Sequence, residues 1–409
     1  MDLTQERGPL TVAAFMDLAL YDPEFGYYAR APQRSGRAGD FFTSVDVGPI
    51  FGELLEAQIA EMADLLTTIT GEDAEKTIGS SASSAVSVFD LVEAGAGNGR
   101  LSADILRAAG QHHPSFFSRI RLHLVEAGAA PRAAQRATLG DLVDHLASSS
   151  GGLPASFEGV LIANELLDAL PVHQVIMRED GLREVYVDVI SDSGPAGTRA
   201  RVRLATREGP PSTPELAEYL ARLGVTLEPG WRAEINLRAV EWVRDAARRL
   251  RRGFIVLVDY GHEARELYSM THADGTLSAF ARHTAAGPES GHSTPPWLHR
   301  PGEQDITAHV DFTSVRAAGE AEGLTTIGFL DQTYFLLGLL TGRRPTGGGG
   351  SAAVSVAQIP DLGADSRPAR ALKTLLMPGG LGSTLKVLIF GKDVGAPALL
   401  GCSYRVRVT

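Results

Sequence analysis

The chain has 409 residues, of which 44% are hydrophobic, so it is long enough to bury a sizeable core in roughly two to three domain-sized units. Its formal net charge of −11 disfavours general binding to nucleic acid or to anionic membranes, and the single cysteine excludes an internal disulfide framework and a cysteine-based zinc site. With no basic N-terminal region before an apolar core and no apolar run near the ~20 residues of a membrane span, the sequence predicts a cytoplasmic protein.

Residues 1–70 are predicted to form an N-terminal helical cap. Turn signals occur at Asp22-Pro23 and Gly26, and the apolar spacing that follows is typical of a helix, with one face formed by Phe51, Leu54, Leu55, Ile59 and Met62. Small and polar residues then predict a loop over residues 71–85. The cap therefore precedes the first predicted strand.

That strand runs directly into a glycine turn. It ends at Glu93, and Gly95, Gly97 and Gly99 follow before a segment with helical apolar spacing. Glycine is needed where the backbone has φ > 0 or where a ligand touches it. A dinucleotide site would need the pattern G-x-G-x-x-G, whose third glycine is absent. The remaining acid-x-G-x-G-x-G pattern is typical of Rossmann-like methyltransferases that bind S-adenosyl-L-methionine.

A second acidic residue supports a cofactor site. Glu126 ends the apolar run 120–125, at the distance where a carboxylate would reach both hydroxyls of a ribose. The alternative for the glycine turn is a tight strand-to-helix connection of the kind found in any α/β protein. Glu93, the three glycines and Glu126 are the predicted cofactor-binding residues of this half of the chain.

Four short apolar runs predict a parallel sheet covered on both faces: 86–92, 120–125, 160–163 and 254–258. The fold class is therefore α/β, a doubly wound Rossmann-like sheet formed by residues 86–171 and 236–409. A further strand at 385–390 is expected to close the sheet edge. Alternating segments in the long stretch between the third and fourth runs predict an inserted β-rich lobe at residues 172–235.

Several blocks in collinear order resemble the MidA family of S-adenosylmethionine-dependent methyltransferases. Besides the glycine turn they are Gly26-Tyr27-Tyr28, Gly39-Asp40-Phe41-Phe42-Thr43-Ser44, Phe51-Gly52-Glu53, Asn164-Glu165-Leu166-Leu167-Asp168-Ala169-Leu170-Pro171, Asp259-Tyr260-Gly261, Gly275-Thr276-Leu277 with His283, and Asp305-Ile306-Thr307-Ala308-His309-Val310-Asp311-Phe312. The resemblance covers about residues 8–340. It implies a class I methyltransferase fold, with the third strand of the cofactor half at residues 137–147. The family includes the mitochondrial complex I assembly factor that methylates a protein arginine. The resemblance therefore implies that the acceptor is a protein, and a subunit of a respiratory complex is one candidate.

The acceptor site is predicted at Asn164, Glu165 and Asp168. They follow the third apolar run, and open α/β sheets bind ligands at the carboxyl ends of their strands. A guanidinium presents parallel N–H groups, so two carboxylates there suit an arginine acceptor, and one of them could take the released proton. The alternative for Asp168 is a helix cap.

The remaining candidates each have a structural alternative. Thr43 and Ser44 are predicted to close over the amino-acid end of the cofactor, or else to satisfy their own loop backbone. Asp259 ends the fourth apolar run and is favoured as a site residue over a cap. His283, His309, Asp305 and Asp311 lack a recognisable ligand spacing, so no metal site is predicted.

Three functions remain at this stage. The first is an S-adenosyl-L-methionine-dependent protein arginine methyltransferase with no nucleic-acid partner. The second is an NAD-dependent oxidoreductase that uses the same turn, and the missing third glycine counts against it. The third is a non-catalytic assembly factor that retains the cofactor fold, and the acidic pair Glu165 and Asp168 counts against complete loss of the site.

Overall fold

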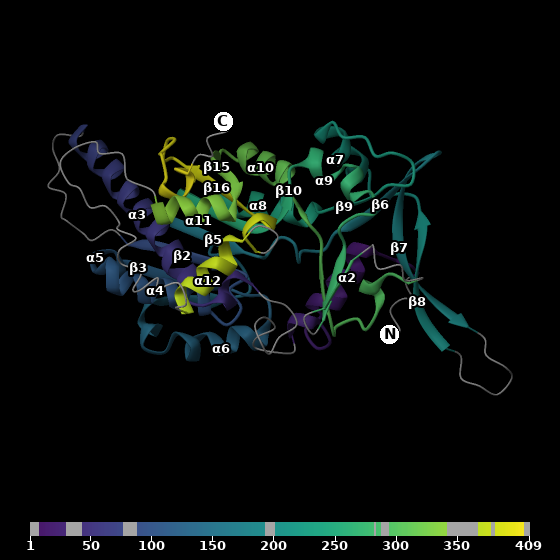
Figure 1. The fold of residues 1–409 in the computed structure, drawn as a ribbon, viewed down its shortest axis with the longest axis horizontal. Helices are drawn as coiled ribbons and strands as arrows, with labels where there is room; N and C mark the ends of the chain where they lie inside the picture. Colours follow the sequence, from purple (N-terminus) through teal and green to yellow (C-terminus); the bar gives the residue numbers. More distant parts are fainter. Residues whose placement is uncertain are drawn as a thin grey trace. The chain divides into compact units, whose positions relative to one another are not determined.

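The computed structural model describes residues 8–29, 43–76, 88–192, 201–281, 284–287, 294–341, 367–377 and 381–404. The chain divides into two compact units, each assembled from three stretches of sequence (Figure 1). Unit 1 contains Met1–Phe41, Leu167–Val243 and Gly261–Ala317. Unit 2 contains Phe42–Leu166, Arg244–Tyr260 and Ala318–Thr409.

Unit 2 is built on a sheet with the strand order β15-β16-β10-β5-β2-β3-β4. Neighbouring strands from β10 to β4 are parallel, whereas β16 is antiparallel to both β10 and β15. The strands are β2 (Phe89–Ala94), β3 (Ile120–Val125), β4 (Leu146–Ser150), β5 (Phe157–Asn164), β10 (Leu250–His262), β15 (Thr325–Asp331) and β16 (Leu385–Lys392). Every residue of β2 is buried, as expected for a parallel strand covered on both faces.

Helices pack on this sheet through continuous apolar surfaces. They are α3 (Ile50–Lys76), α4 (Arg100–His112), α5 (Pro114–Phe117), α6 (Ala129–Leu139), α11 (Gln332–Thr341), α12 (Arg367–Leu376) and α13 (Leu381–Thr384). One buried cluster joins α3, α4 and α11 to the strands and includes Phe51, Leu106, Val160 and Phe335. Two further helices, α8 (Leu237–Arg249) and α10 (Phe312–Ala321), contribute residues to both units.

Unit 1 contains two small antiparallel sheets. The larger has the order β1-β7-β6-β9, with β8 paired to β7, and the smaller has the order β12-β11-β13. The strands are β1 (Leu10–Thr11), β6 (His173–Arg178), β7 (Gly181–Asp192), β8 (Arg201–Gly209), β9 (Arg232–Ile235), β11 (Ser278–Ala281), β12 (Thr284–Ala286), β13 (Asp305–Thr307) and β14 (Val310–Asp311), the last of which pairs with the end of β10. The helices are α2 (Val12–Tyr21), α7 (Glu215–Leu223) and α9 (Ala264–Leu267).

A separate apolar core holds unit 1 together. It joins α2 to both sheets and includes Phe15, Met16, Val187, Trp297 and Ile306. β1 pairs with β7, so the start of the chain joins the sheet built from residues 173–235. This grouping differs from a single N-terminal cap over residues 1–70, because α2 belongs to unit 1 and α3 to unit 2.

The four apolar runs form the parallel strands β2, β3, β5 and β10, which confirms the predicted α/β fold class. Three local predictions were wrong. α3 continues to Lys76, because residues 71–76 include good helix formers. The strand expected at 137–147 starts only at Leu146, after α6 and a short 3₁₀ segment. The strand at the sheet edge is β15 rather than β16. No residue of β15 is fully buried, so its sequence lacks the continuous apolar run that predicted the other strands. Among the described residues, no helix is long and apolar enough to cross a membrane.

Candidate functional site

The predicted cofactor and acceptor residues of unit 2 lie at the carboxyl ends of its parallel strands. The neighbouring parallel strands β3, β2, β5 and β10 end there, in that spatial order. Glu126 follows β3, the glycine turn follows β2, Asn164 ends β5, and Glu165 comes directly after it. Parallel α/β sheets bind ligands outside the carboxyl ends of their strands, so the candidate site lies at these strand ends.

The three glycines of the turn have positive φ angles of 72° at Gly95, 51° at Gly97 and 85° at Gly99. A Cβ atom on Gly95 would lie 3.1 Å from Leu166 Cδ1, and one on Gly99 would lie 3.1 Å from Leu124 Cδ1. At Gly97 no described atom lies within 4 Å of that position. The outer glycines therefore serve close packing, whereas the middle one leaves space for a ligand to touch the backbone.

Glu126 is tied directly to the middle of this turn. Its carboxylate accepts hydrogen bonds from Gly97 N at 2.9 Å and from Gly128 N at 2.7 Å. The side chain is half-buried, and burial raises its pKa above the usual range. The acid expected to face a ribose thus stands beside the one glycine of the turn that faces open space.

Glu93 points instead to the start of α4. Its Oε2 accepts from Ser102 N at 3.1 Å and from the Ser102 hydroxyl. Ser102 is the third residue of α4, so the carboxyl group satisfies a backbone donor that has no partner within the helix. Burial raises the pKa of Glu93 to about 7. Glu93 therefore fixes where the helix starts after the glycine turn.

Sequence reasoning missed Gln135, which clamps the turn from α6. This fully buried side chain donates from Nε2 to Gly97 O at 2.9 Å, and its Oε1 accepts from Ser149 Oγ at 2.6 Å. Gln135 and Ser149 are both far from the turn in sequence. A lone glutamine within a helix gives no pattern that would have marked it.

The backbone at Glu165 is held in an unusual conformation. Its φ is 51°, and a non-glycine residue with positive φ costs on the order of 1–3 kcal/mol. The neighbouring strand β10 stabilises it, because Glu165 N donates to Val258 O at 2.8 Å and Leu166 N donates to Asp259 Oδ2 at 3.1 Å. The other carboxylate oxygen of Asp259 accepts from Tyr260 N at 2.9 Å. In these contacts Asp259 caps backbone groups.

The Glu165 carboxyl group lies against Asn164 and Ser44. Its Oε1 accepts from Asn164 Nδ2 at 3.1 Å and from Ser44 N at 3.2 Å. Burial of the carboxyl group raises the pKa of Glu165 to about 8, with Asp259 and Asp46 adding to the rise. Asn164 Oδ1 is buried and has no hydrogen-bond partner within the described part of the chain. An acceptor oxygen is therefore available next to a carboxyl group.

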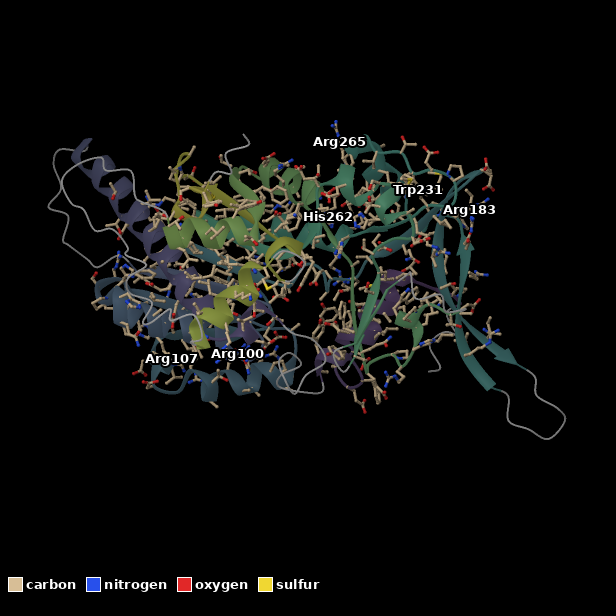
Figure 2. All side chains as sticks on the ribbon, in the orientation of Figure 1. Arg100, Arg107, Arg183, Trp231, His262 and Arg265 are labelled. Carbon is tan, nitrogen blue, oxygen red and sulfur yellow. The ribbon has the colours of Figure 1, made fainter. Side chains whose placement is uncertain are left out.

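Thr43 and Ser44 are both buried, and their polar groups contact protein atoms. Thr43 donates from N and Oγ1 to Asp46 Oδ2, at 3.0 and 2.9 Å, and Ser44 Oγ donates to Gln332 Oε1 at 3.2 Å. Asp46 also forms an ion pair of 2.5 Å with Arg100, whose side chain is labelled in Figure 2. Arg100 begins α4, so this segment is fastened to the helix that follows the glycine turn.

The other predicted residues belong to unit 1 or fall outside the described residues. Asp168 belongs to unit 1, where its backbone carbonyl accepts from Ala308 N at 3.0 Å. Asp305 accepts from the Tyr28 hydroxyl at 2.7 Å, and Asp311 accepts from the Tyr219 hydroxyl at 2.8 Å. His283, like the family block at residues 39–42, lies outside the described residues. Three other side chains, His262, His272 and His309, form the group in the described structure that could hold a metal.

Comparison with known proteins gives concordant matches. Residues 76–330 match the model of a family described as S-adenosyl-L-methionine-dependent methyltransferases. The chain is 31% identical over 356 residues to mouse (Mus musculus) "Protein arginine methyltransferase NDUFAF7, mitochondrial", which covers 81% of this chain and 71% of that protein. The human (Homo sapiens) protein of the same name is 30% identical over 362 residues, or 81% of this chain and 70% of its own length.

A solved structure matches nearly the whole chain. It is a protein from Burkholderia thailandensis, crystallised with S-adenosyl-homocysteine bound, with a TM-score of 0.76 and 27% sequence identity. The match covers 98% of this chain and 92% of that one. The relatives correct one prediction. A cytoplasmic location was wrong, because the mouse, fly and human relatives are named as mitochondrial proteins.

Proposed function

The chain belongs to the family of S-adenosyl-L-methionine-dependent methyltransferases, and we propose that it methylates an arginine side chain of a protein. Membership confirms the resemblance to the MidA family and the cofactor inferred from the glycine turn. It also supports the methyltransferase hypothesis over the NAD-dependent oxidoreductase and over a non-catalytic assembly factor.

The proposed cofactor site consists of the glycine turn, Glu126, Thr43 and Ser44. The open position at Gly97 would allow the cofactor to approach the backbone, and Glu126 is held at that position by Gly97 N. Both oxygens of Glu126 retain capacity for a further donor, because a carboxylate oxygen can accept two hydrogen bonds. Its proposed partners are the two ribose hydroxyls.

One observation carries the acceptor proposal: a buried, unpartnered acceptor oxygen stands beside a carboxyl group. Asn164 Oδ1 needs a donor, and Glu165 can accept more than the two hydrogen bonds it has. A guanidinium offers five N–H donors and no acceptor, which complements such a pair. The curated relatives are named protein arginine methyltransferases, in agreement with this choice. The proposed acceptor site consists of Asn164 and Glu165, both in unit 2.

The chemistry requires alignment and removal of one proton. S-adenosyl-L-methionine supplies an electrophilic methyl group bound to a sulfonium sulfur. Asn164 and Glu165 would hold the guanidinium nitrogen in line with that bond, and positioning of this kind supplies several kcal/mol. The N–H proton displaced as the N–CH₃ bond forms would pass to the Glu165 carboxylate. Since burial raises the pKa of Glu165 to about 8, the arriving guanidinium must first displace the proton that this group carries at neutral pH.

The proposed acceptor is a protein, and within that class a subunit of a respiratory complex. The family resemblance supports this narrower choice, because the family includes a complex I assembly factor.

The test is transfer of a labelled methyl group from S-adenosyl-L-methionine into proteins of a cell lysate, followed by mass spectrometry of the modified residue. We expect label on arginine, suppressed by S-adenosylhomocysteine and by Glu165→Gln. Asp141→Asn, at an exposed position of unit 2, is the matched control and should label like the wild type. Label on lysine, on glutamine or on a small molecule would exclude the arginine proposal.

A further inference from the structure

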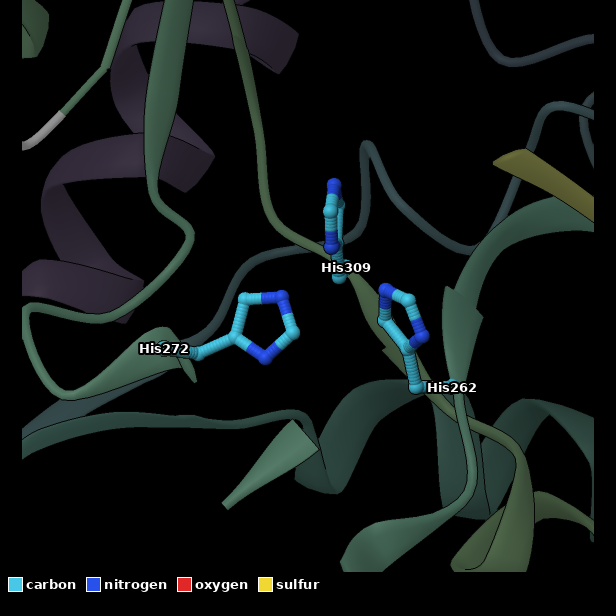
Figure 3. Close-up of side chains that lie close together, drawn as sticks. All are labelled: His262, His272 and His309. Atoms are coloured by element: carbon cyan, nitrogen blue, oxygen red, sulfur yellow. The ribbon is translucent and has the colours of Figure 1, made fainter. Parts of the chain in front are cut away.

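Three histidines from separate segments of unit 1 converge on one point (Figure 3). His262 ends β10, His272 ends the 3₁₀ segment Met270–His272, and His309 directly precedes β14. Each ring offers a nitrogen atom, and the three nitrogens lie within 4.8 Å of one another. None of these residues belongs to the proposed cofactor or acceptor site.

The spacing of the rings agrees with a tetrahedral metal centre. A zinc–nitrogen distance of about 2.0–2.1 Å, with the ring centre roughly 1.1 Å further, puts three coordinated imidazole centres about 5.2 Å apart. The observed separations are 4.9 Å for His262 and His272, 5.3 Å for His262 and His309, and 5.9 Å for His272 and His309. Small rotations of the rings would bring the nitrogens to about 3.4 Å from one another, as tetrahedral coordination requires.

Glu266 lies close to two of the three rings. Its backbone oxygen lies 3.1 Å from His272 Nδ1, and its carboxylate Oε1 lies 3.1 Å from His262 Nδ1. His272 can donate from Nδ1 to that backbone oxygen, which keeps its lone pair on Nε2, and metal-bound histidines characteristically donate their other N–H to a carbonyl or carboxylate. Figure 3 shows one nitrogen of His262 directed towards His309. Nε2 of His272 is thus left to coordinate, together with the nitrogen of His262 that is directed towards His309.

His309 supplies the third nitrogen from a fixed segment. Its Nδ1 is buried and has no hydrogen-bond partner in the described structure, although buried polar atoms are almost always paired. Its backbone N donates to Thr276 Oγ1 at 3.0 Å, and Thr276 N donates to the buried Glu234 at 2.7 Å. These bonds hold the backbone of the segment in place, and burial keeps the unpaired ring nitrogen from water. A metal ion would satisfy it.

We propose that His262, His272 and His309 bind one divalent transition-metal ion, Zn²⁺, through three imidazole nitrogens. Imidazole ligands suit zinc, and three protein ligands leave the fourth tetrahedral position for water or another ligand. The sequence predicted no metal, because ligands separated by 10 and 37 residues match no known spacing. Only the fold of unit 1 brings them together.

The test uses the full chain without a histidine tag, stripped with a chelator and titrated with Zn²⁺ against a chromophoric competitor. We expect one Zn²⁺ per chain, an upward shift of the melting temperature with Zn²⁺, and a four-coordinate absorption spectrum with Co²⁺. His262→Ala, His272→Ala and His309→Ala should each weaken binding at least tenfold. His299→Ala, an exposed histidine of the same unit, is the matched control and should bind like the wild type.

Glu266→Gln provides a variant that keeps the ligands and the shape of the supporting side chain. It removes the negative charge that lies 3.1 Å from His262 Nδ1 and should therefore weaken Zn²⁺ binding. Circular dichroism in chelator shows whether each variant is folded before metal is added. The proposal is overturned if the wild type binds no Zn²⁺ at micromolar concentration, or if the folded variants bind it as tightly as His299→Ala.

Discussion

At the scale of single residues, Gly97 and Glu165 contrast in the reason for their positive φ angles. Gly97 has φ 51° and open space where a side chain would stand, as expected where a ligand touches the backbone. Glu165 has the same φ of 51° although it carries a side chain. The hydrogen bonds from Glu165 N and Leu166 N to β10 hold that conformation. Such strain is typical of functional sites.

Gly97→Val should abolish the stabilisation of the protein by S-adenosylhomocysteine, because the new side chain would occupy the space beside the turn. The measurement is the shift of the melting temperature with ligand. Gly140→Val is the matched control, because Gly140 also has a positive φ, 57°, with no described atom within 4 Å of a Cβ. It carries similar backbone strain away from the turn, so its ligand shift should persist. A normal shift for Gly97→Val would show that the cofactor binds elsewhere.

Glu165→Gln should flatten the dependence of stability on pH. The native carboxyl group has a pKa of about 8, above the value of about 4.3 in an unfolded chain, so the native state binds more protons between these values. Stability contributed by this group is therefore present at low pH and is lost as the pH rises from about 4.5 to about 8. One proton limits the slope to about 1.4 kcal/mol per pH unit.

The measurement is urea unfolding of the wild type and Glu165→Gln from pH 5 to pH 8. The variant should lose less stability over this range, because glutamine reproduces the neutral form and cannot ionise. The exposed Asp141→Asn should follow the wild type. Parallel curves for the wild type and Glu165→Gln would show that the group ionises normally.

At the scale of elements, the glycine turn depends on helices and strands that were not part of its motif. Gln135 of α6 holds Gly97 O, Ser149 of β4 holds Gln135, and Glu93 of β2 holds the start of α4. Residues of α6, β4 and β2 therefore hold the turn in position together. A cofactor that binds the turn would find it already in its bound shape, which lowers the entropic cost of binding.

Gln135→Ala should weaken binding of S-adenosylhomocysteine about tenfold, because Gly97 O loses its donor and the turn loses its clamp. Calorimetric titration measures the effect. Thr138→Ala on the same helix is the matched control, since the Thr138 hydroxyl bonds only to Ala134 O in the contacts described for it, at 3.2 Å. Equal affinities for both variants would show that the turn keeps its shape without Gln135.

At the scale of the whole molecule, the two proposed ligands belong to different units. The cofactor residues are all in unit 2 and the three histidines are all in unit 1. Each unit has its own apolar core, one that includes Phe51 and Phe335 and one that includes Met16 and Trp297. Ligand effects on local stability should therefore be separable.

Hydrogen exchange should show this separation. S-adenosylhomocysteine should slow amide exchange at residues 93–102 and 126–135, whereas Zn²⁺ should slow it at residues 261–272 and 308–311, because a ligand raises the cost of opening the structure that binds it. Mass spectrometry of peptides from the full chain measures both. Protection by S-adenosylhomocysteine confined to unit 1 would contradict the cofactor site.

The sequence by itself determined the fold class, the cofactor and the family. Continuous apolar runs separated by helical segments are local patterns, and they specify buried parallel strands wherever they occur. The glycines of the turn are equally local, because each is required by the backbone angle or the close approach at its own position. The Asn164-Glu165 block was likewise visible, since it follows the end of a strand.

Only the tertiary structure decided which side chains meet. Ser44 reaches Glu165 across 121 residues, and Gln135 reaches Gly97 across 38. His262, His272 and His309 share no periodicity or spacing, and their convergence depends on where β10, the segment at Met270–His272 and β14 pack in unit 1. Local patterns reflect backbone requirements and burial, whereas contacts between distant residues depend on packing, which no single stretch of sequence encodes.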